Sequence, residues 1–276
     1  MKLYFASPTA NSDFYLLRNF GVNQMLFSYH YLAKMKKREY KKYLKIDDYF
    51  LDSGAFSAMN IGVEINIKKY IDFILENDPE NYAGLDVIGN GTKTLYNTKI
   101  MINEGLKPIH TFHKGEEVEW LYKSLELDLN YIAIGGMVGE IKKKKELTGW
   151  LDKVWKIIIE RRPEIKVHGF GCTSYDLMAK YPWYSVDSTT WNVARKFGEG
   201  FDIRGKRKSK HEIMRDFEDI SYFKRMDEGT KLIVNTAHTM MEWEEEINTK
   251  HQNTDFNYLT NQQSLWEEEC EGYCGL

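Results

Sequence analysis

The feature that most constrains this fold is an eightfold alternation of short apolar or β-branched runs with segments of helical periodicity. The runs lie at residues 3–6, 25–29, 49–52, 82–87, 108–112, 131–134, 166–170 and 184–187. Segments between them, such as 65–76 and 147–162, carry apolar residues at helical spacing. Such alternation predicts an α/β fold of parallel βαβ units. Eight repeats in roughly 190 residues favour a compact (β/α)8 TIM-type barrel, with a doubly wound open sheet as the alternative.

The chain length and the position of the eighth run predict how the rest is organised. A chain of 276 residues can form one large domain. We expect residues 1–210 to form the barrel and residues 211–276 to form a C-terminal helical extension packed on it. Three cysteines are too few for a disulfide framework. No apolar run approaches the ~20 residues that span a bilayer, and no signal-peptide pattern opens the chain, so we expect a soluble, cytoplasmic protein without a membrane partner.

Polar residues and glycines follow the expected strands where each one ends. In a barrel of this type, chemistry gathers at the carboxyl ends of the strands. These positions are Asp52, Ser53, Gly54, Asp86, His110, His113, Gly135, Gly136, His168, Gly169 and Asp187. If the barrel brings Asp52 and Asp187 together, they form a pair of carboxylates, one suited to nucleophilic attack and one to proton transfer.

Five of these segments, in order, resemble the tRNA-guanine transglycosylase superfamily. Asp-Ser-Gly-Ala-Phe-Ser at 52–57 is similar to the family's Asp-Ser-Gly-Gly-aromatic-Gln, and Leu-Asp-Val at 85–87 falls at its base-recognising aspartate. The most specific match is Ala-Ile-Gly-Gly-Met-Val-Gly-Glu at 133–140, against Ala-Ile-Gly-Gly-Leu-x-Val-Gly-Glu. Residues 167–171 resemble a strand that ends in Met-Gly-Val-Gly, and 185–188 resemble the segment with the nucleophilic aspartate. The resemblance covers residues 49–191.

The resemblance implies a base-exchange glycosyltransferase that replaces guanine in a polynucleotide with a 7-deazaguanine. Asp187 would attack the sugar C1′ to form a covalent glycosyl intermediate, and Asp52 would be the general acid and base. Substrate binding would involve Ser53, Phe56, Asp86, His113, Gly135, Gly136, Met137, His168 and Gly169. Asp86 would accept hydrogen bonds from the N–H edge of the purine, while Phe56 and His168 would enclose its ring. His113 stands where the family often has Gln.

Each of these residues also has an ordinary structural interpretation. Asp52 and Asp187 could cap a turn or a helix, and Asp86 could be structural. Gly135 and Gly136 could form a tight turn, and His168 could pack in the core. We expect His110 to be a core residue or a support for the site rather than a ligand.

We expect no metal and no cofactor. The family's structural zinc motif, Cys-x-Cys-x-x-Cys followed by a distant His, is missing from the sequence. Cys270 and Cys274, together with His251, are a poor tetrahedral set. A short chain without that module resembles the phage and bacterial branch that modifies DNA, which favours DNA over tRNA and host cytoplasm if the chain is phage-encoded.

Two basic segments suit a polynucleotide despite a net charge of −3. One covers residues 34–45. The other lies beyond Asp187, and its cations are Arg204, Lys206, Arg207, Lys208 and Lys210. These residues could neutralise phosphates or be a solvated surface. The expected partners are a polynucleotide and a free 7-deazaguanine, with a homodimer left open. A non-catalytic nucleic-acid-binding subunit is the alternative of another class.

Overall fold

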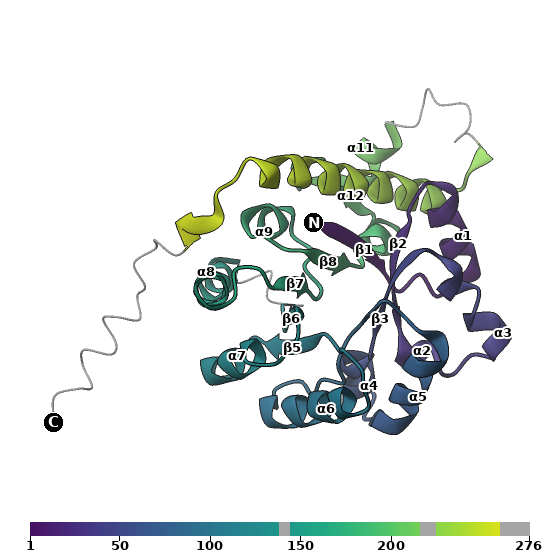
Figure 1. Cartoon of the computed structure of the whole chain (residues 1–276). Coiled ribbons are helices and arrows are strands. Elements are labelled where there is room, and N and C mark those ends of the chain that lie inside the picture. Colours follow the sequence, from purple (N-terminus) through teal and green to yellow (C-terminus); the bar gives the residue numbers. More distant parts are fainter. Residues whose placement is uncertain (138–143, 216–224, 260–276) are drawn as a thin grey trace.

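The computed structural model describes residues 1–137, 144–215 and 225–259 and shows a curled, parallel, eight-stranded sheet surrounded by helices (Figure 1). The strands are β1 (Lys2–Ala6), β2 (Gln24–Ser28), β3 (Asp48–Asp52), β4 (Asn81–Tyr82), β5 (His110–His113), β6 (Tyr131–Gly135), β7 (Lys166–Gly169) and β8 (Ser185–Ser188). Their order is β4-β3-β2-β1-β8-β7-β6-β5, and every pairing is parallel. The prediction of parallel βαβ units is confirmed.

The two outer strands of this order, β4 and β5, approach each other at one parallel bridge. Ala83 pairs with Ile109. The amide of Ile109 donates to the carbonyl of Tyr82, at 2.9 Å, and the amide of Gly84 donates to the carbonyl of Ile109, at 2.8 Å. The curled sheet is therefore consistent with the predicted TIM-like barrel rather than with an open sheet.

Helices follow most of the strands. They are α1 (Asn11–Asn19), α2 (Tyr29–Leu32), α3 (Lys37–Tyr40), η1 (Tyr43–Lys45), α4 (Ala55–Asn60), α5 (Ile67–Asn77), α6 (Gly91–Asn103), α7 (Val118–Leu125), α8 (Lys144–Arg161), α9 (Tyr175–Lys180), η3 (Thr190–Asn192), α10 (Val193–Phe197), α11 (Lys210–Arg215), α12 (Glu228–Gln252) and η5 (Phe256–Leu259). No helix of the described segments is long and apolar enough to cross a bilayer.

The last long helix, α12, lies against the barrel. It contacts α9, α10, β1 and α1, and Figure 1 shows it running past β1 from the α1 side to the α9 side. At its far end, Asn248 accepts a hydrogen bond from the amino terminus and donates to the carbonyl of Met1, at 2.9 Å. The helix thus fills the place in the ring between the helices that follow β7 and β1.

Two local predictions were wrong. The expected strand at 82–87 is only the two-residue β4, because the chain turns at Gly84, whose carbonyl accepts from the amide of Asp86 at 3.1 Å. The helical segment expected between the runs at 25–29 and 49–52 is not one helix but three short pieces, α2, α3 and η1. The helical extension expected from residue 211 onward begins within α11, and residues 216–224 lie outside the described part of the chain.

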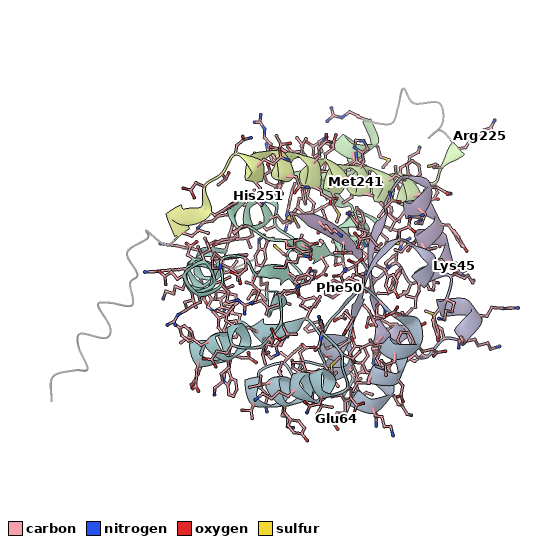
Figure 2. All side chains as sticks on the ribbon, viewed as in Figure 1. Lys45, Phe50, Glu64, Arg225, Met241 and His251 are labelled. Atoms are coloured by element: carbon pink, nitrogen blue, oxygen red, sulfur yellow. The ribbon has the colours of Figure 1, made fainter. Side chains whose placement is uncertain are left out.

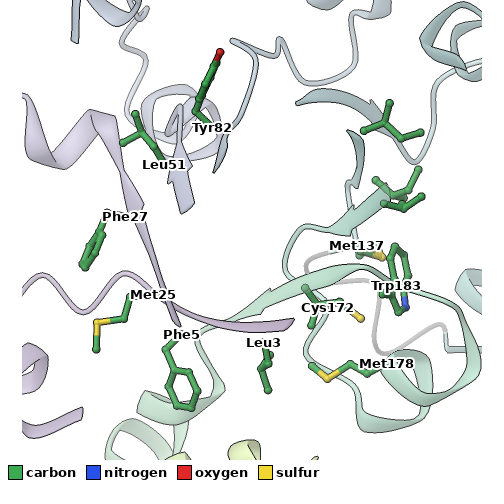
Figure 3. Packing of buried hydrophobic residues seen from close by; sticks show 14 of the residues in the cluster. Leu3, Phe5, Met25, Phe27, Leu51, Tyr82, Met137, Cys172, Met178 and Trp183 are labelled. Atoms are coloured by element: carbon green, nitrogen blue, oxygen red, sulfur yellow. The ribbon is translucent and has the colours of Figure 1, made fainter. Parts of the chain in front are cut away.

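The hydrophobic core has two layers, because successive side chains of a strand point to opposite faces. On β1, Leu3 and Phe5 belong to the layer between strands and helices shown in Figure 3, whereas Tyr4 and Ala6 belong to a separate cluster. That second cluster contains Tyr4, Ala6, Leu26, Phe50, Ala83, Ile109, Tyr131 and Ala133. Its members alternate with the outer-layer residues, which places them inside the barrel, and Figure 2 shows Phe50 near the centre of the strands.

Candidate active site

Strand parity places both predicted catalytic carboxylates at the same end of the barrel interior. Asp52 follows the interior residue Phe50 by two positions and ends β3. Asp187 lies on β8, and β1 and β2 separate β8 from β3 in the sheet. Both strands are parallel, so their carboxyl ends meet at one mouth. Asp86 follows β4 at the same end.

A tight turn after β3 holds Asp52 in place. The amide of Gly54 donates to Oδ2 of Asp52, at 3.0 Å. Gly54 has φ 81°, and a Cβ atom there would collide with the side chains of Ser28 and His30. The turn therefore requires glycine, and it leads directly into α4, a helix that the sequence did not predict.

The surroundings of Asp52 favour its protonated form. Burial raises the pKa of its carboxyl group, and the negative charges of Asp86 and Asp187 raise it further, to about 8. The amides of Gly54 and Ser53 oppose this shift but do not cancel it. A carboxylic acid that keeps its proton at neutral pH can donate that proton to a leaving group.

Asp86 is held by two neighbours. Oγ of Ser53 donates to Oδ1 of Asp86, at 3.0 Å, and Nε2 of His113 lies 2.9 Å from Oδ2. Glu116 supports the histidine from the other side, with its Oε1 3.5 Å from Nδ1 of His113 and its Oε2 accepting from the His113 amide at 3.1 Å.

His113 is a buried cation in this arrangement. Burial alone would lower the pKa of its imidazole, but the contacts with Asp86 and Glu116 outweigh that effect and raise the pKa to about 9. Both ring nitrogens face carboxylates, so His113 orients Asp86 and has no nitrogen directed at a bound base. A direct contact of His113 with a base stays a prediction.

Asp187 receives two N–H donors on one oxygen. The amide of Gly171 donates to Oδ1 at 2.8 Å, and Nε2 of His168 lies 3.3 Å from the same atom. The Asp187 residue is 7% exposed. Among the described residues, Oδ2 receives no hydrogen bond, so the two oxygens of this carboxylate differ in their surroundings.

His168 does not form the predicted stacking pair with Phe56. His168 is fully buried and stacks on Phe50, with ring centroids 4.4 Å apart. Phe170 contacts it edge-on at 4.5 Å. Phe56, on α4, is 51% exposed. The expectation that both rings enclose a purine is therefore wrong for His168, since its faces are covered, while the Phe56 ring is exposed.

The glycines at the ends of β6 and β7 make room for protein groups. A Cβ at Gly135 would lie 2.8 Å from Cδ2 of His113, and one at Gly136 would lie 2.9 Å from the amide of Lys114. A Cβ at Gly169 would lie 3.1 Å from the Trp183 ring. The absence of a side chain at these three glycines therefore allows His113, Lys114 and Trp183 to pack against them.

Met137 and His110 lie away from the mouth. Met137 is 2% exposed in the layer between strands and helices (Figure 3), so the structure does not bring its side chain to the carboxylates. His110 is buried, with Nδ1 2.8 Å from Oγ1 of Thr98. Residues 138–140 of the Gly-Gly-Met-Val-Gly-Glu motif lie outside the described residues.

The basic segment after β8 is a hairpin rather than a loop. It consists of β9 (Glu199–Phe201) and β10 (Arg207–Ser209), and its turn is held by Oδ1 of Asp202, which accepts from the amides of Arg204 and Lys206 at 2.9 Å. The hairpin packs on α12, where Nε1 of Trp243 donates to the carbonyl of Asp202 at 3.1 Å.

Arg207 of the hairpin and Lys210, the first residue of α11, have acidic partners. Arg207 pairs with Glu199 at 3.0 Å, and Lys210 pairs with Glu228 at 2.6 Å. Both pairs are exposed and therefore weak, so phosphates could replace the carboxylates.

Two surface hollows of the described chain lie away from the mouth. One, of about 570 Å³, lies between α6 and α7 and is lined by Tyr96 and Trp120. The other, of about 400 Å³, lies between the amino-terminal ends of the strands and α12. The titratable groups with shifted pKa values, Asp52 and His113, lie instead at the carboxyl ends of the strands.

Metal ligands do not gather in the described part of the chain. No three His, Cys, Asp or Glu side chains of residues 1–137, 144–215 and 225–259 come together in a metal-binding geometry. Cys172 is buried and unpaired, and Cys270 and Cys274 lie outside the described residues.

Sequence reasoning missed the groups that support the carboxylates. Glu116 behind His113, and Ser185 and Tyr131 behind His168, were not anticipated. The available signal was strand parity, because residues 131, 133 and 135 of β6 and residues 185 and 187 of β8 must point inward together.

Comparison with known proteins does not assign this chain to a family. No protein-family model matches the sequence. No curated protein matches it significantly either.

Proposed function

We propose that this chain is a guanine transglycosylase that exchanges guanine in a polynucleotide, with DNA favoured, for a free 7-deazaguanine. The observation that best supports this proposal is that two carboxylates at one barrel mouth have different surroundings. Burial and like charge raise the pKa of Asp52 to about 8, whereas Asp187 accepts two N–H donors on Oδ1. Two acids held in different environments suit different roles.

The reaction divides into two displacements. In the first, Oδ2 of Asp187 bonds to the sugar C1′, the glycosidic bond breaks toward the base nitrogen, and Asp52 supplies the proton that the departing guanine needs. In the second, Asp52 removes a proton from the incoming 7-deazaguanine, whose nitrogen bonds to C1′ and displaces Asp187. The enzyme ends in its starting state, and the sugar configuration is retained.

Base recognition would involve Asp86 and Phe56. The carboxylate of Asp86 is fixed by Ser53 and His113 and matches the N–H donors at the edge of guanine. Phe56 offers an exposed ring on α4, the helix that follows Asp52 in the chain, and stacking of a base on an aromatic ring is worth about 1–3 kcal/mol. A guanine within a duplex must be flipped out before it can reach the mouth.

The preference for DNA rests on the resemblance to the branch that modifies DNA. The hairpin with Arg204, Lys206 and Lys208 leaves β8 soon after Asp187, and its cations suit phosphates.

The test is incubation of the protein with labelled 7-deazaguanine and, in separate reactions, duplex DNA, single-stranded DNA and tRNA. We expect label in DNA and none with Asp187→Ala. Label in tRNA alone would replace the DNA assignment with a tRNA enzyme. Guanine release that does not depend on added base would show a hydrolase, and binding without label or release would show a non-catalytic subunit.

A further inference from the structure

A chain of hydrogen bonds crosses the barrel interior and ends on Asp187. The hydroxyl of Tyr131 lies 2.5 Å from Oγ of Ser185, and the same Oγ lies 2.5 Å from Nδ1 of His168. Nε2 of His168 is 3.3 Å from Oδ1 of Asp187. Three strands, β6, β7 and β8, contribute these four side chains.

The direction of every bond in this chain follows from the chemistry of its last member. An ionised carboxylate only accepts, so Nε2 of His168 must carry the hydrogen. His168 is fully buried; burial lowers the pKa of its imidazole despite the opposing effect of Asp187, so the ring is neutral and Nδ1 is an acceptor. Ser185 therefore donates to Nδ1, and its oxygen accepts from the Tyr131 hydroxyl.

We propose that His168 is a positioning residue that fixes the rotation of the Asp187 carboxylate, so that Oδ2 is directed to the sugar; this inference rests on the proposed function. The Gly171 amide and His168 both bind Oδ1, and two donors on one oxygen define the plane of the group. Ser185 and Tyr131 hold His168 in the tautomer that this geometry needs.

The packing around His168 makes it a rigid support. Its ring lies against Phe50 with an interplanar angle of 28°, and Phe170 closes a second side. The neighbouring Gly169 leaves a space that Trp183 fills. A histidine that cannot rotate transmits its orientation to the carboxylate it binds.

Substitution of His168 provides the first test. His168→Met removes the donor but keeps an apolar side chain of similar length, whereas His168→Gln keeps an N–H donor. We expect His168→Met to lower the rate of the covalent step roughly 100-fold with little change in the affinity for 7-deazaguanine, and His168→Gln to restore most of the rate.

His110→Gln is the matched control. His110 is also a buried barrel histidine bonded to a hydroxyl, that of Thr98, but it has no contact with Asp187. We expect His110→Gln to destabilise the fold about as much as His168→Met does. The rate of its covalent step should stay within about twofold of wild type. A His168→Met enzyme with the wild-type rate, or equal losses in both variants, would overturn the proposal.

A measurement on the free protein separates this inference from the proposed function. Nitrogen-15 NMR at pH 7.5 should show His168 as the neutral Nε2–H tautomer, and Ser185→Ala should abolish this fixed tautomer. A protonated or Nδ1–H His168 at that pH would overturn the inference even if 7-deazaguanine is exchanged, and would decide the matter if His168→Met fails to fold. If His168 has the expected tautomer but the protein never incorporates label into a polynucleotide, the proposed function is refuted instead.

Discussion

Nε2 of His113 lies 2.9 Å from Oδ2 of Asp86, and both side chains are almost completely buried, at 4% and 12% exposure. The pair sets the position of the carboxylate that we assign to base recognition. It also ties part of the stability of the barrel to the protonation of one imidazole.

Replacing His113 with Gln should therefore destabilise the protein in a pH-dependent manner. The folded-state pKa is raised to about 9 from an ordinary value near 6.5, so the stabilisation is complete below about pH 6.5 and is lost as the pH rises through about 9. We expect the variant to lose about 3 kcal/mol of unfolding free energy at pH 6 and much less at pH 10, measured by urea unfolding. His238→Gln, at an exposed pair with Glu242, should cost under about 1 kcal/mol. A His113 penalty that does not change with pH would contradict the ion pair.

Asp52→Asn should stabilise the protein at neutral pH while it abolishes base exchange. The folded-state pKa of Asp52 is raised to about 8. The folded state thus holds a proton that the unfolded state releases above about pH 4, and the wild type loses stability between about pH 4 and pH 8. Asn keeps an oxygen for the Gly54 amide and cannot ionise. A shift of this size corresponds to up to about 5 kcal/mol more stability for the variant at pH 8 and to no difference near pH 4, by thermal unfolding at both values. A variant that is less stable than wild type at pH 8 would show that the pKa of Asp52 is not raised by folding.

Gly135→Ala should disturb the site through His113. The added Cβ would lie 2.8 Å from Cδ2 of that ring, so the imidazole must move away from Asp86. We expect a loss of about 1–3 kcal/mol together with weaker binding of 7-deazaguanine, by urea unfolding and calorimetry. Gly149→Ala, on α8 with no neighbour within 4 Å of the added atom, is the control and should gain up to about 1 kcal/mol of helix stability. Equal behaviour of the two variants would contradict the packing argument.

Phe56→Ala should weaken base binding without affecting the fold. Phe56 is 51% exposed, so its removal costs little packing, but loss of a stacking face is worth about 1–3 kcal/mol. We expect the dissociation constant for 7-deazaguanine to rise about tenfold or more, with an unchanged melting temperature. Leu75→Ala, at a similarly exposed position on α5, should change neither. An unaffected dissociation constant in Phe56→Ala would remove that ring from the site.

The alternation of strands and helices was predictable because the spacing of apolar residues within each segment indicates its secondary structure. Seven of the eight expected strands match the observed ones within two residues at either end. The exception, the run at 82–87, has the composition of a strand, but the hydrogen bonds of Gly84 and Asp86 form a turn that no periodicity reveals. The short α4 also escaped prediction, because its position depends on a left-handed Gly54 packed on Ser28 and His30.

The carboxylates of the site could be predicted, but not the groups that hold them. Asp52 and Asp187 end strands, so a parallel barrel brings them to one mouth. His168 could not be assigned, since an aromatic ring at a strand end either stacks on a ligand or supports a neighbour. Only the burial by Phe50 and Phe170, and the contact with Asp187, distinguish the two roles.

The most direct test of the account is capture of the glycosyl intermediate. Protein is mixed with a guanine-containing DNA oligonucleotide without added base, denatured, digested and analysed by mass spectrometry. We predict that Asp187 carries a covalently attached oligonucleotide that has lost one guanine. This adduct disappears when 7-deazaguanine is added before denaturation, and it never forms in Asp187→Ala. An adduct on another residue, an adduct that persists in Asp187→Ala, or exchange of the base without any adduct in the wild-type protein would contradict the assignment of Asp187 as the nucleophile.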